Sequence, residues 1–141
     1  MKLLLVNPPR VSGYAVVREE RFEHKDIGSV YPPLSLLYCG AVAQQAGWDV
    51  NLVDANGLDL DLFTVEAEMD LFQPDAVLIR LGFDTQEADL KVLQAAKVRG
   101  AFCFVRCKIV ADVKWLVTRT MQEHPFIDGY FLDEPECLLP A

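Results

Sequence analysis

The stretch PDAVLIRLGFDTQEADLKVLQAAKVRGAFCFV, residues 74–105, contains one complete strand–helix–strand unit. It begins with an apolar run opened by proline and ends with a second apolar run, AFCFV. Between the two runs, Leu90, Leu93 and Ala96 recur at helical spacing, and Gly100 follows as a helix stop signal. Two apolar strands joined by a helix are typical of a parallel sheet covered on both faces.

The same alternation extends over the whole chain of 141 residues. The apolar runs predict strands over residues 2–6, 49–54, 74–81, 101–105 and 127–132. The amphipathic stretches predict helices over residues 33–46, 61–72, 86–98 and 109–123. In the first helix we expect a buried face made of Leu34, Leu37, Tyr38, Ala41 and Val42. The pattern predicts one α/β domain over residues 1–141, a doubly wound, flavodoxin-like (Rossmann-like) parallel sheet of five strands in the order 2-1-3-4-5 with helices on both faces.

Composition and charge describe an ordinary soluble α/β protein. Hydrophobic residues make up 52% of the chain, charged residues make up 24%, and the net charge is -8 without a run of lysine or arginine. A nucleic-acid partner is therefore disfavoured. The N-terminal apolar stretch over 3–6 is too short for a signal peptide or a membrane span, so we expect no membrane and a cytoplasmic location.

The cysteines indicate neither disulfides nor a metal centre. Nothing in the sequence indicates secretion, the setting in which disulfides persist. Cys103 and Cys107 have the spacing that opens a C-x3-C-x2-C cluster motif, but Val110 stands at the third ligand position. Because Cys103 falls inside an apolar strand, we expect it in the core.

Ligands of doubly wound sheets bind beyond the carboxyl ends of the strands, where the strand order reverses. The loops at that edge would be 7–32, 81–86, 106–109 and 133–136. The first loop opens with VNPPRVSG, which lacks the glycine pattern of a dinucleotide site, the amide donors of a phosphate loop and the acids of a response-regulator receiver. Since G-x-S-x-G is also absent, we expect the domain alone not to be catalytic.

Four segments together resemble a known family: LLLVNPPR (3–10), YPPLSLLYCGAVAQQAGWDVNLVDAN (31–56), FQPDAVLI (72–79) and FIDGYFLDEPE (126–136). The chain resembles the N-terminal cobalamin-binding domain of cobalamin-dependent radical S-adenosylmethionine (radical SAM) enzymes. In that family Asn-Pro-Pro ends the first strand and Pro-Pro-Leu-x-Leu opens the first helix. This pair of motifs is the specific part of the match.

The resemblance implies that cobalamin binds along the carboxyl edge of the sheet. The residues implied to line its site are Asn7, Pro8, Pro9, Arg10, Tyr31, Pro32, Pro33, Leu34, Arg80, Leu81, Gly82, Arg106, Cys107, Glu134 and Glu136. Pro32 and Pro33 would fix the backbone at the helix start and hold the end of the long loop beside the corrin ring. The alternative is that the two prolines only start the helix.

The resemblance also implies a partner, a C-terminal radical SAM domain of the same polypeptide. That domain would hold an iron–sulfur cluster and S-adenosylmethionine, and the parent enzyme would carry out methyl transfer or radical rearrangement on an unknown substrate. Because the cluster motif is absent here, we expect residues 1–141 to be a domain excised from a longer protein, with a naturally short protein as the alternative.

The expected site departs from the family at two strand ends. Arg80, Leu81 and Gly82 stand where the family tends to place Ser or Thr, and Arg106 and Cys107 replace its usual Gly-Gly. An arginine in place of glycine at position 106 would fill space that the cobalamin tail would occupy. These departures favour an alternative hypothesis, a degenerate domain of the same fold that has lost cobalamin and serves as a scaffold or substrate-recognition module.

Arg80 and Arg106 end neighbouring strands of the predicted order, so we expect them to lie close together. Two guanidiniums favour an anion such as phosphate, which makes an anion or nucleotide binder a third possibility. The other interpretation is pairing with local acids, for which the sequence offers Asp84, Asp133, Glu134 and Glu136.

His24 lies in EHKDIG (23–28), a near miss to the D-x-H-x-x-G motif of the better-known cobalamin domains. The resembled family commonly dispenses with that histidine. As a neutral imidazole His24 could ligate cobalt, and the alternative is an ordinary solvated loop histidine.

Overall fold

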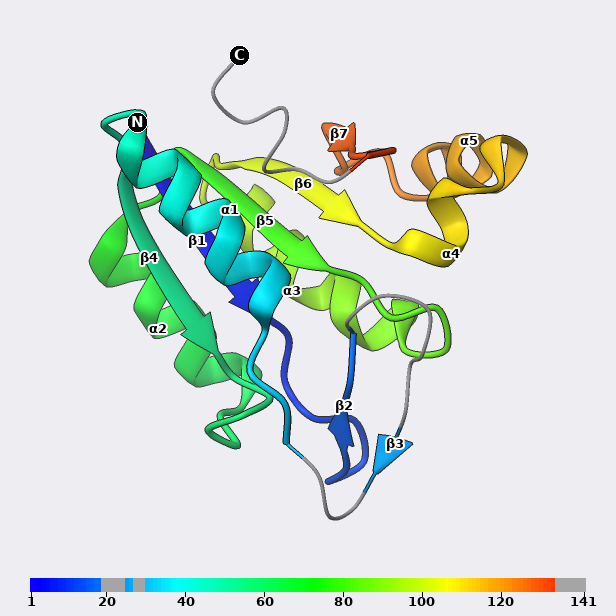
Figure 1. The fold of residues 1–141 in the computed structure, drawn as a ribbon, viewed down its shortest axis with the longest axis horizontal. Helices are drawn as coiled ribbons and strands as arrows, with labels where there is room; N and C mark the ends of the chain where they lie inside the picture. The colour runs from blue at the N-terminus through cyan, green and yellow to red at the C-terminus, as the bar shows by residue number, and fades with distance from the viewer. Residues whose placement is uncertain (19–24, 27–29, 134–141) are drawn as a thin grey trace.

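The computed structural model describes residues 1–18, 25–26 and 30–133. A parallel sheet of five strands forms its centre, as predicted: β1 (Lys2–Asn7), β4 (Asp49–Asp54), β5 (Ala76–Arg80), β6 (Phe102–Arg106) and β7 (Gly129–Tyr130). Their spatial order is β4-β1-β5-β6-β7 (Figure 1). The α/β class and the Rossmann-like architecture expected from the sequence are confirmed.

Two further strands, β2 (Ala15–Val16) and β3 (Lys25–Asp26), form a separate antiparallel pair inside the long first loop. These two strands were not expected from the sequence. Because they pair with each other, the parallel sheet is made from the first strand and the last four strands of the chain rather than from its first five. The pair lies beyond the carboxyl ends of the sheet strands (Figure 1).

The helices are α1 (Leu34–Gln45), α2 (Leu62–Phe72), α3 (Gln86–Val98), α4 (Lys108–Ala111) and α5 (Lys114–Glu123). The Asp61 carboxylate caps the start of α2 by accepting the Thr64 amide at 2.8 Å, and Gln73 ends α2 in the left-handed conformation. The prediction of one helix over 109–123 is wrong. Val113 adopts an extended backbone between α4 and α5, which its β-branched side chain favours over a helix.

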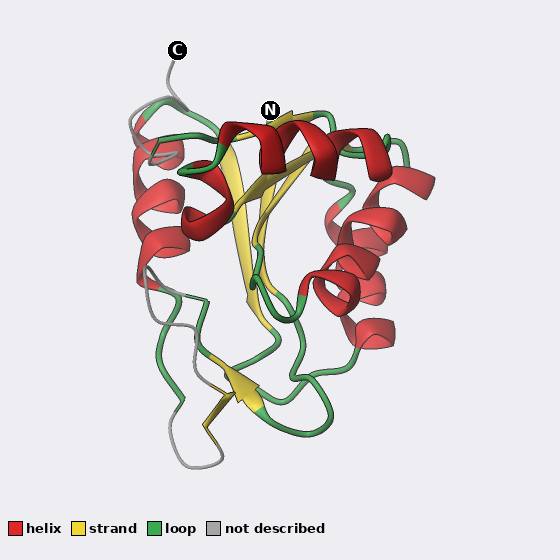
Figure 2. Ribbon diagram, turned by 90° about the vertical axis from the view of Figure 1, so that its right-hand side faces the viewer, coloured by secondary structure: helices red, strands yellow, loops and turns green. Residues whose placement is uncertain are grey.

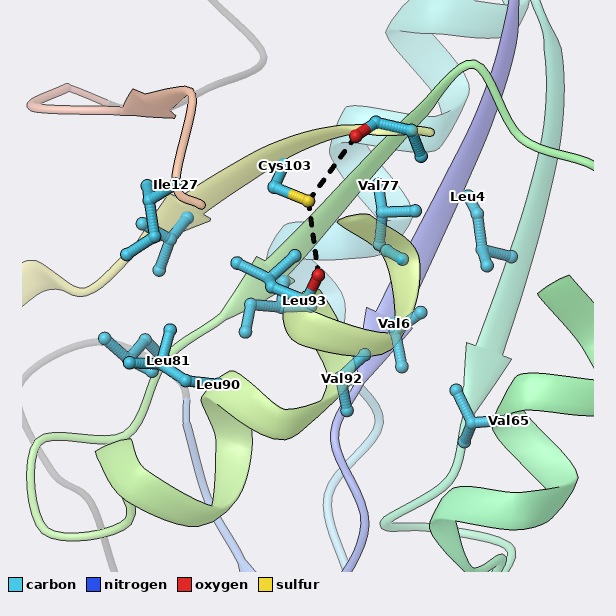
Figure 3. Packing of buried hydrophobic residues seen from close by; sticks show 14 of the residues in the cluster. Leu4, Val6, Val65, Val77, Leu81, Leu90, Val92, Leu93, Cys103 and Ile127 are labelled. Carbon is cyan, nitrogen blue, oxygen red and sulfur yellow. Dashed lines mark hydrogen bonds between the residues drawn. The ribbon is translucent and has the colours of Figure 1, made fainter. Parts of the chain in front are cut away.

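Figure 2 shows the strands between layers of helices. On one face α1 packs on β1 and β4, and on the other α2, α3, α4 and α5 contribute to the larger core. Cys103 belongs to that core, as expected (Figure 3). Its thiol donates to the Leu93 carbonyl at 3.3 Å, and burial raises the pKa of Cys103 to about 11, so the group stays protonated at neutral pH.

The prediction for the buried face of α1 is wrong. Leu34, Leu37, Tyr38 and Ala41 are exposed, whereas Leu36, Cys39, Gly40 and Ala43 face the sheet. A side chain at Gly40 would press on Leu5 of β1, so small residues on this face let the helix approach the sheet closely. Apolar residues surround α1 on all sides, and periodicity therefore cannot select the buried face.

None of the helices in the described ranges is long and apolar enough to cross a membrane.

Candidate functional site

A buried ion pair anchors the first loop to the carboxyl edge of the sheet. Arg18 Nε donates to Asp89 Oδ2 at 2.9 Å, and Arg18 Nη2 donates to Asp89 Oδ1 at 2.6 Å. The same guanidinium donates to the carbonyl oxygens of Pro8 and Pro9, each at 3.0 Å. Both charged side chains are 1% exposed, so a bidentate pair with further acceptors compensates a costly burial of charge.

The Asp89 carboxylate also holds the loop that follows β5. Its Oδ2 accepts the Gly82 amide at 2.9 Å and the Thr85 hydroxyl at 2.7 Å. Neither Arg18 nor Asp89 was predicted as a site residue. One signal was present: Asp89 stands four and seven residues before Leu93 and Ala96, on the apolar face of the predicted helix, where a carboxylate needs a partner.

Arg80 and Arg106 occupy partner positions of the β5–β6 ladder, which confirms that they lie close together. Arg80 Nε donates to the Arg18 carbonyl at 3.3 Å, and Arg106 Nη1 donates to the Phe131 carbonyl at 3.2 Å. Arg80 is 3% exposed and Arg106 is 0% exposed. These guanidiniums therefore fill the ends of the two strands.

Their chain neighbours do not line an open site either. Leu81 and Cys107 are buried in the larger core, and Tyr130 donates from its hydroxyl to the Cys107 carbonyl at 3.4 Å. Burial raises the pKa of Tyr130, so its hydroxyl is neutral. Gly82 has no room for a side chain, because a Cβ there would overlap the Thr85 hydroxyl.

Asn7 ties β1 to β4. Its Nδ2 donates to Asp54 Oδ1 at 2.7 Å, and the same oxygen accepts the Gly57 amide at 2.9 Å. Asn56 then joins this loop to the first loop, since its Oδ1 accepts the Val16 amide at 2.7 Å. These bonds make Asn7 a structural anchor at the strand end.

Pro9 and Arg10 border an open cavity of about 340 Å³ between the starts of α2 and α3. Arg10 Nε donates to the Asn56 carbonyl at 3.0 Å and lies 3.4 Å from Asp59 Oδ1. Lys91 and Asp61 also face this cavity, whose apolar wall comes from Leu60, Leu62 and Val92. The volume falls within the range of small-molecule pockets.

At the start of α1, Pro32 and Pro33 stand where other helices have a residue whose side chain caps the first backbone amides. The Leu34 amide donates to the Pro32 carbonyl at 2.8 Å, and no side chain caps the helix at Pro33. Pro33 is buried, whereas Tyr31 and Leu34 are exposed. His24, Glu134 and Glu136 lie outside the described residues.

The described strand ends do not fit cobalamin. The resemblance implies that glycines after the fourth sheet strand give the nucleotide tail close access to the backbone, and the buried Arg106 stands there instead. The buried Arg80 stands where the resembled family tends to have Ser or Thr. Among the described residues, no group of three or more His, Cys, Asp or Glu side chains could hold a metal ion.

No family model and no curated protein matches the chain. The solution NMR structure of a de novo designed Rossmann 2x3 fold protein is similar, with a TM-score of 0.53 and 10% sequence identity, over 96% of this chain and 81% of the designed chain. At this identity the likeness supports the Rossmann-like fold alone.

Proposed function

We propose that the chain is a domain of the cobalamin-binding type that has lost cobalamin and serves a radical SAM parent enzyme as a scaffold or substrate-recognition module. The observation that carries this proposal is the burial of Arg80 and Arg106 side by side at the carboxyl ends of β5 and β6. Arg106 stands where the resembled family has the glycine that gives the cofactor tail access, and Arg80 stands where that family has Ser or Thr.

The energetic argument concerns what a bound cofactor would displace. Arg80 donates to the backbone of Arg18, and Arg18 is held by Asp89 in a buried pair. Displacing the Arg80 guanidinium would break its hydrogen bond to the Arg18 carbonyl, and leaving a buried donor unsatisfied costs about 1–3 kcal/mol. A cofactor entering at these strand ends would have to offset that cost before gaining any contact of its own.

The proposed partner is the C-terminal radical SAM domain of the same polypeptide, packed on the outer face of α1. Leu34 is 52% exposed and Tyr38 is 63% exposed, and Leu37 extends the same apolar surface. A helix that is apolar on all sides is typically buried on all sides. The cavity bordered by Arg10 and Lys91 supports a recognition role for a small molecule.

Cobalamin binding is the second candidate function. It is favoured by the order of elements at the edge of the sheet: Asn-Pro-Pro closes β1, a long loop follows, and Pro32-Pro33 precede α1 directly. The described residues do not include His24, which would be the candidate lower ligand.

Gel filtration after incubation with hydroxocobalamin separates the two functions. We expect the purified chain to emerge without a cobalamin absorption spectrum. Retained colour at a stoichiometry near one would contradict the proposal and favour cobalamin binding. In that case the His24→Ala variant decides the ligand, since loss of the axial-ligand band in that variant alone would assign His24 to cobalt.

A further inference from the structure

The cavity of about 340 Å³ between the starts of α2 and α3 combines charges of both signs with an apolar wall. Arg10 and Lys91 border it with positive charge, and Asp59 and Asp61 border it with negative charge. The apolar part of its wall comes from Leu60, Leu62, Ala88 and Val92. Convergent polar groups on an apolar wall are typical of a site for a small molecule.

The two cations keep donors that the described residues do not use. Arg10 Nε donates to the Asn56 carbonyl at 3.0 Å, but Nη1 and Nη2 of Arg10 make no hydrogen bond to any described residue. Lys91 is exposed and forms no hydrogen bond or ion pair within the described ranges. The outer edge of a guanidinium and a nearby ammonium suit a carboxylate, which accepts hydrogen bonds on both oxygens.

The two acids keep acceptors for a positively charged group. Asp61 Oδ1 accepts the Thr64 amide at 2.8 Å and the Thr64 hydroxyl at 2.7 Å, while no described residue donates to Asp61 Oδ2. The bonds from Thr64 lower the pKa of Asp61 below 3.8, so its carboxylate is charged at neutral pH. Asp59 Oδ1 lies 3.4 Å from Arg10 Nε, and its side chain is 67% exposed. Such an exposed pair is weak and can rearrange around a ligand at little cost.

The backbone that carries these groups is already fixed. The Leu60 amide donates to the Ala55 carbonyl at 2.9 Å, which closes the loop after β4. In this loop Asp59 has a φ of 54°, a left-handed conformation that aspartate adopts more readily than most residues. The turn over 11–14 borders the cavity from the first loop and is closed by two backbone hydrogen bonds of 3.0 and 3.1 Å. A preformed wall of this kind lowers the ordering cost of binding.

We propose that this cavity binds an α-amino acid with an apolar side chain. The carboxylate of the ligand meets Arg10 and Lys91, its ammonium meets Asp59 and Asp61, and its side chain lies on the apolar wall. A zwitterion uses both signs of charge, whereas a plain anion would also meet two carboxylates and a plain cation would meet two positive groups. The inference rests on the recognition role proposed above, since it names the ligand class of that cavity.

The size of the cavity supports a ligand of this class. Its volume lies at the small end of the range for small-molecule pockets, which suits an amino acid better than a dinucleotide.

An NMR titration of the isotopically labelled full chain with L-leucine, and separately with L-phenylalanine, tests the assignment. We expect at least one of them to shift the amide signals of Leu60, Leu62 and Lys91 saturably, with a dissociation constant of about 1 mM or tighter. Three analogues of leucine isolate its parts: its keto acid lacks the ammonium, isopentylamine lacks the carboxylate, and glycine lacks the side chain. Each should bind at least about tenfold more weakly than leucine.

Lys91→Met tests the positive side of the cavity without disturbing the fold, because Lys91 is exposed and has no partner among the described residues. We expect this variant to bind leucine at least about fivefold more weakly. Lys114→Met is the matched control: it removes the same charge from an exposed position at the start of α5, outside the cavity, and should leave the affinity unchanged.

Amino-acid binding and cobalamin binding are read separately. Absence of shifts with both amino acids up to about 10 mM would overturn the inference. Equal affinity for leucine and its keto acid would also overturn it and assign the cavity to anions, and equal affinity for isopentylamine would assign it to cations. Retention of cobalamin on gel filtration is a different result, which contradicts the proposed loss of the cofactor and not the ligand of this cavity.

Discussion

Arg18 and Asp89 are 71 positions apart in the chain, yet their side chains form a bidentate pair at the carboxyl edge of the sheet. The pair joins the first loop to α3, and the loop after β5 depends on it through Gly82 and Thr85. This network ties together the edge at which Rossmann-like proteins bind their ligands.

Removing one partner of this pair should be strongly destabilising. We expect Asp89→Leu to lower the free energy of unfolding by about 3–5 kcal/mol, because Arg18 would be left buried without its counter-ion. The double variant Arg18→Met with Asp89→Leu should recover much of that loss. Urea unfolding followed by circular dichroism measures both values, and Arg119→Met, which breaks the exposed Arg119–Glu123 pair, should cost less than about 1 kcal/mol.

If the double variant were as unstable as Asp89→Leu alone, the loss would come from packing or from the other hydrogen bonds of Asp89. The interpretation as an uncompensated charge would then be wrong.

Gly82 should not tolerate a side chain. A Cβ at this position would overlap the Thr85 hydroxyl, so we expect Gly82→Ala to cost about 1–3 kcal/mol in unfolding free energy. Thr85→Ala alone should cost about 1 kcal/mol through its lost hydrogen bond to Asp89. In the double variant, Thr85→Ala should cost no unfolding free energy beyond that lost in Gly82→Ala alone, because the side chain that the new Cβ would overlap is gone. A loss in the double variant equal to the sum of the two single losses would contradict the proposed overlap.

The sequence could predict the sheet because its central strands are continuously apolar. In β1 and β5 nearly every residue is buried, and parallel strands enclosed on both faces leave that signature. The neighbourhood of Arg80 and Arg106 followed directly from the predicted strand order, without any knowledge of contacts.

The features that could not be predicted are of two kinds. One depends on contacts between residues far apart in the chain, and the other on a helix whose two faces are equally apolar. Arg18 meets Asp89 only after the first loop folds back over the sheet edge, so the apolar surroundings of Asp89 in α3 indicate that it needs a partner but no local pattern identifies Arg18 as that partner. In α1 both faces are apolar, so hydrophobicity does not determine which face is buried. The buried face contains Gly40 and Ala43, and these small residues let the helix approach β1 closely.

The corrected orientation of α1 can be tested by two leucines that are close in sequence. Leu36 is fully buried, so Leu36→Ala should lower the unfolding free energy by about 2–5 kcal/mol. Leu34 is half exposed, so Leu34→Ala should change it by no more than about 0.5 kcal/mol. Thermal and urea unfolding of the two variants compare them directly, and the reverse ranking would restore the face expected from the sequence.

Asp128 should make the stability of the chain depend on pH in the acidic range. Burial alone would raise the pKa of Asp128, but hydrogen bonds from Lys97 and from the Cys103 amide outweigh it and lower the pKa below the ordinary value of 3.8. A carboxyl whose pKa is lower in the folded state stabilises the fold above its unfolded pKa, and this contribution is lost as the pH falls through the folded pKa.

We therefore expect Asp128→Asn to be less stable than the wild-type chain at pH 7, because the charged acceptor for Lys97 and Cys103 is lost. The difference in melting temperature should shrink as the pH falls below about 4, where the wild-type carboxyl becomes protonated. Lys97→Met is the matched variant: it should remove the part of the pH dependence due to Lys97 and keep the part due to the amide. A difference between wild type and Asp128→Asn that stays constant from pH 7 to pH 2.5 would show that charge on Asp128 does not stabilise the junction of β6 and β7.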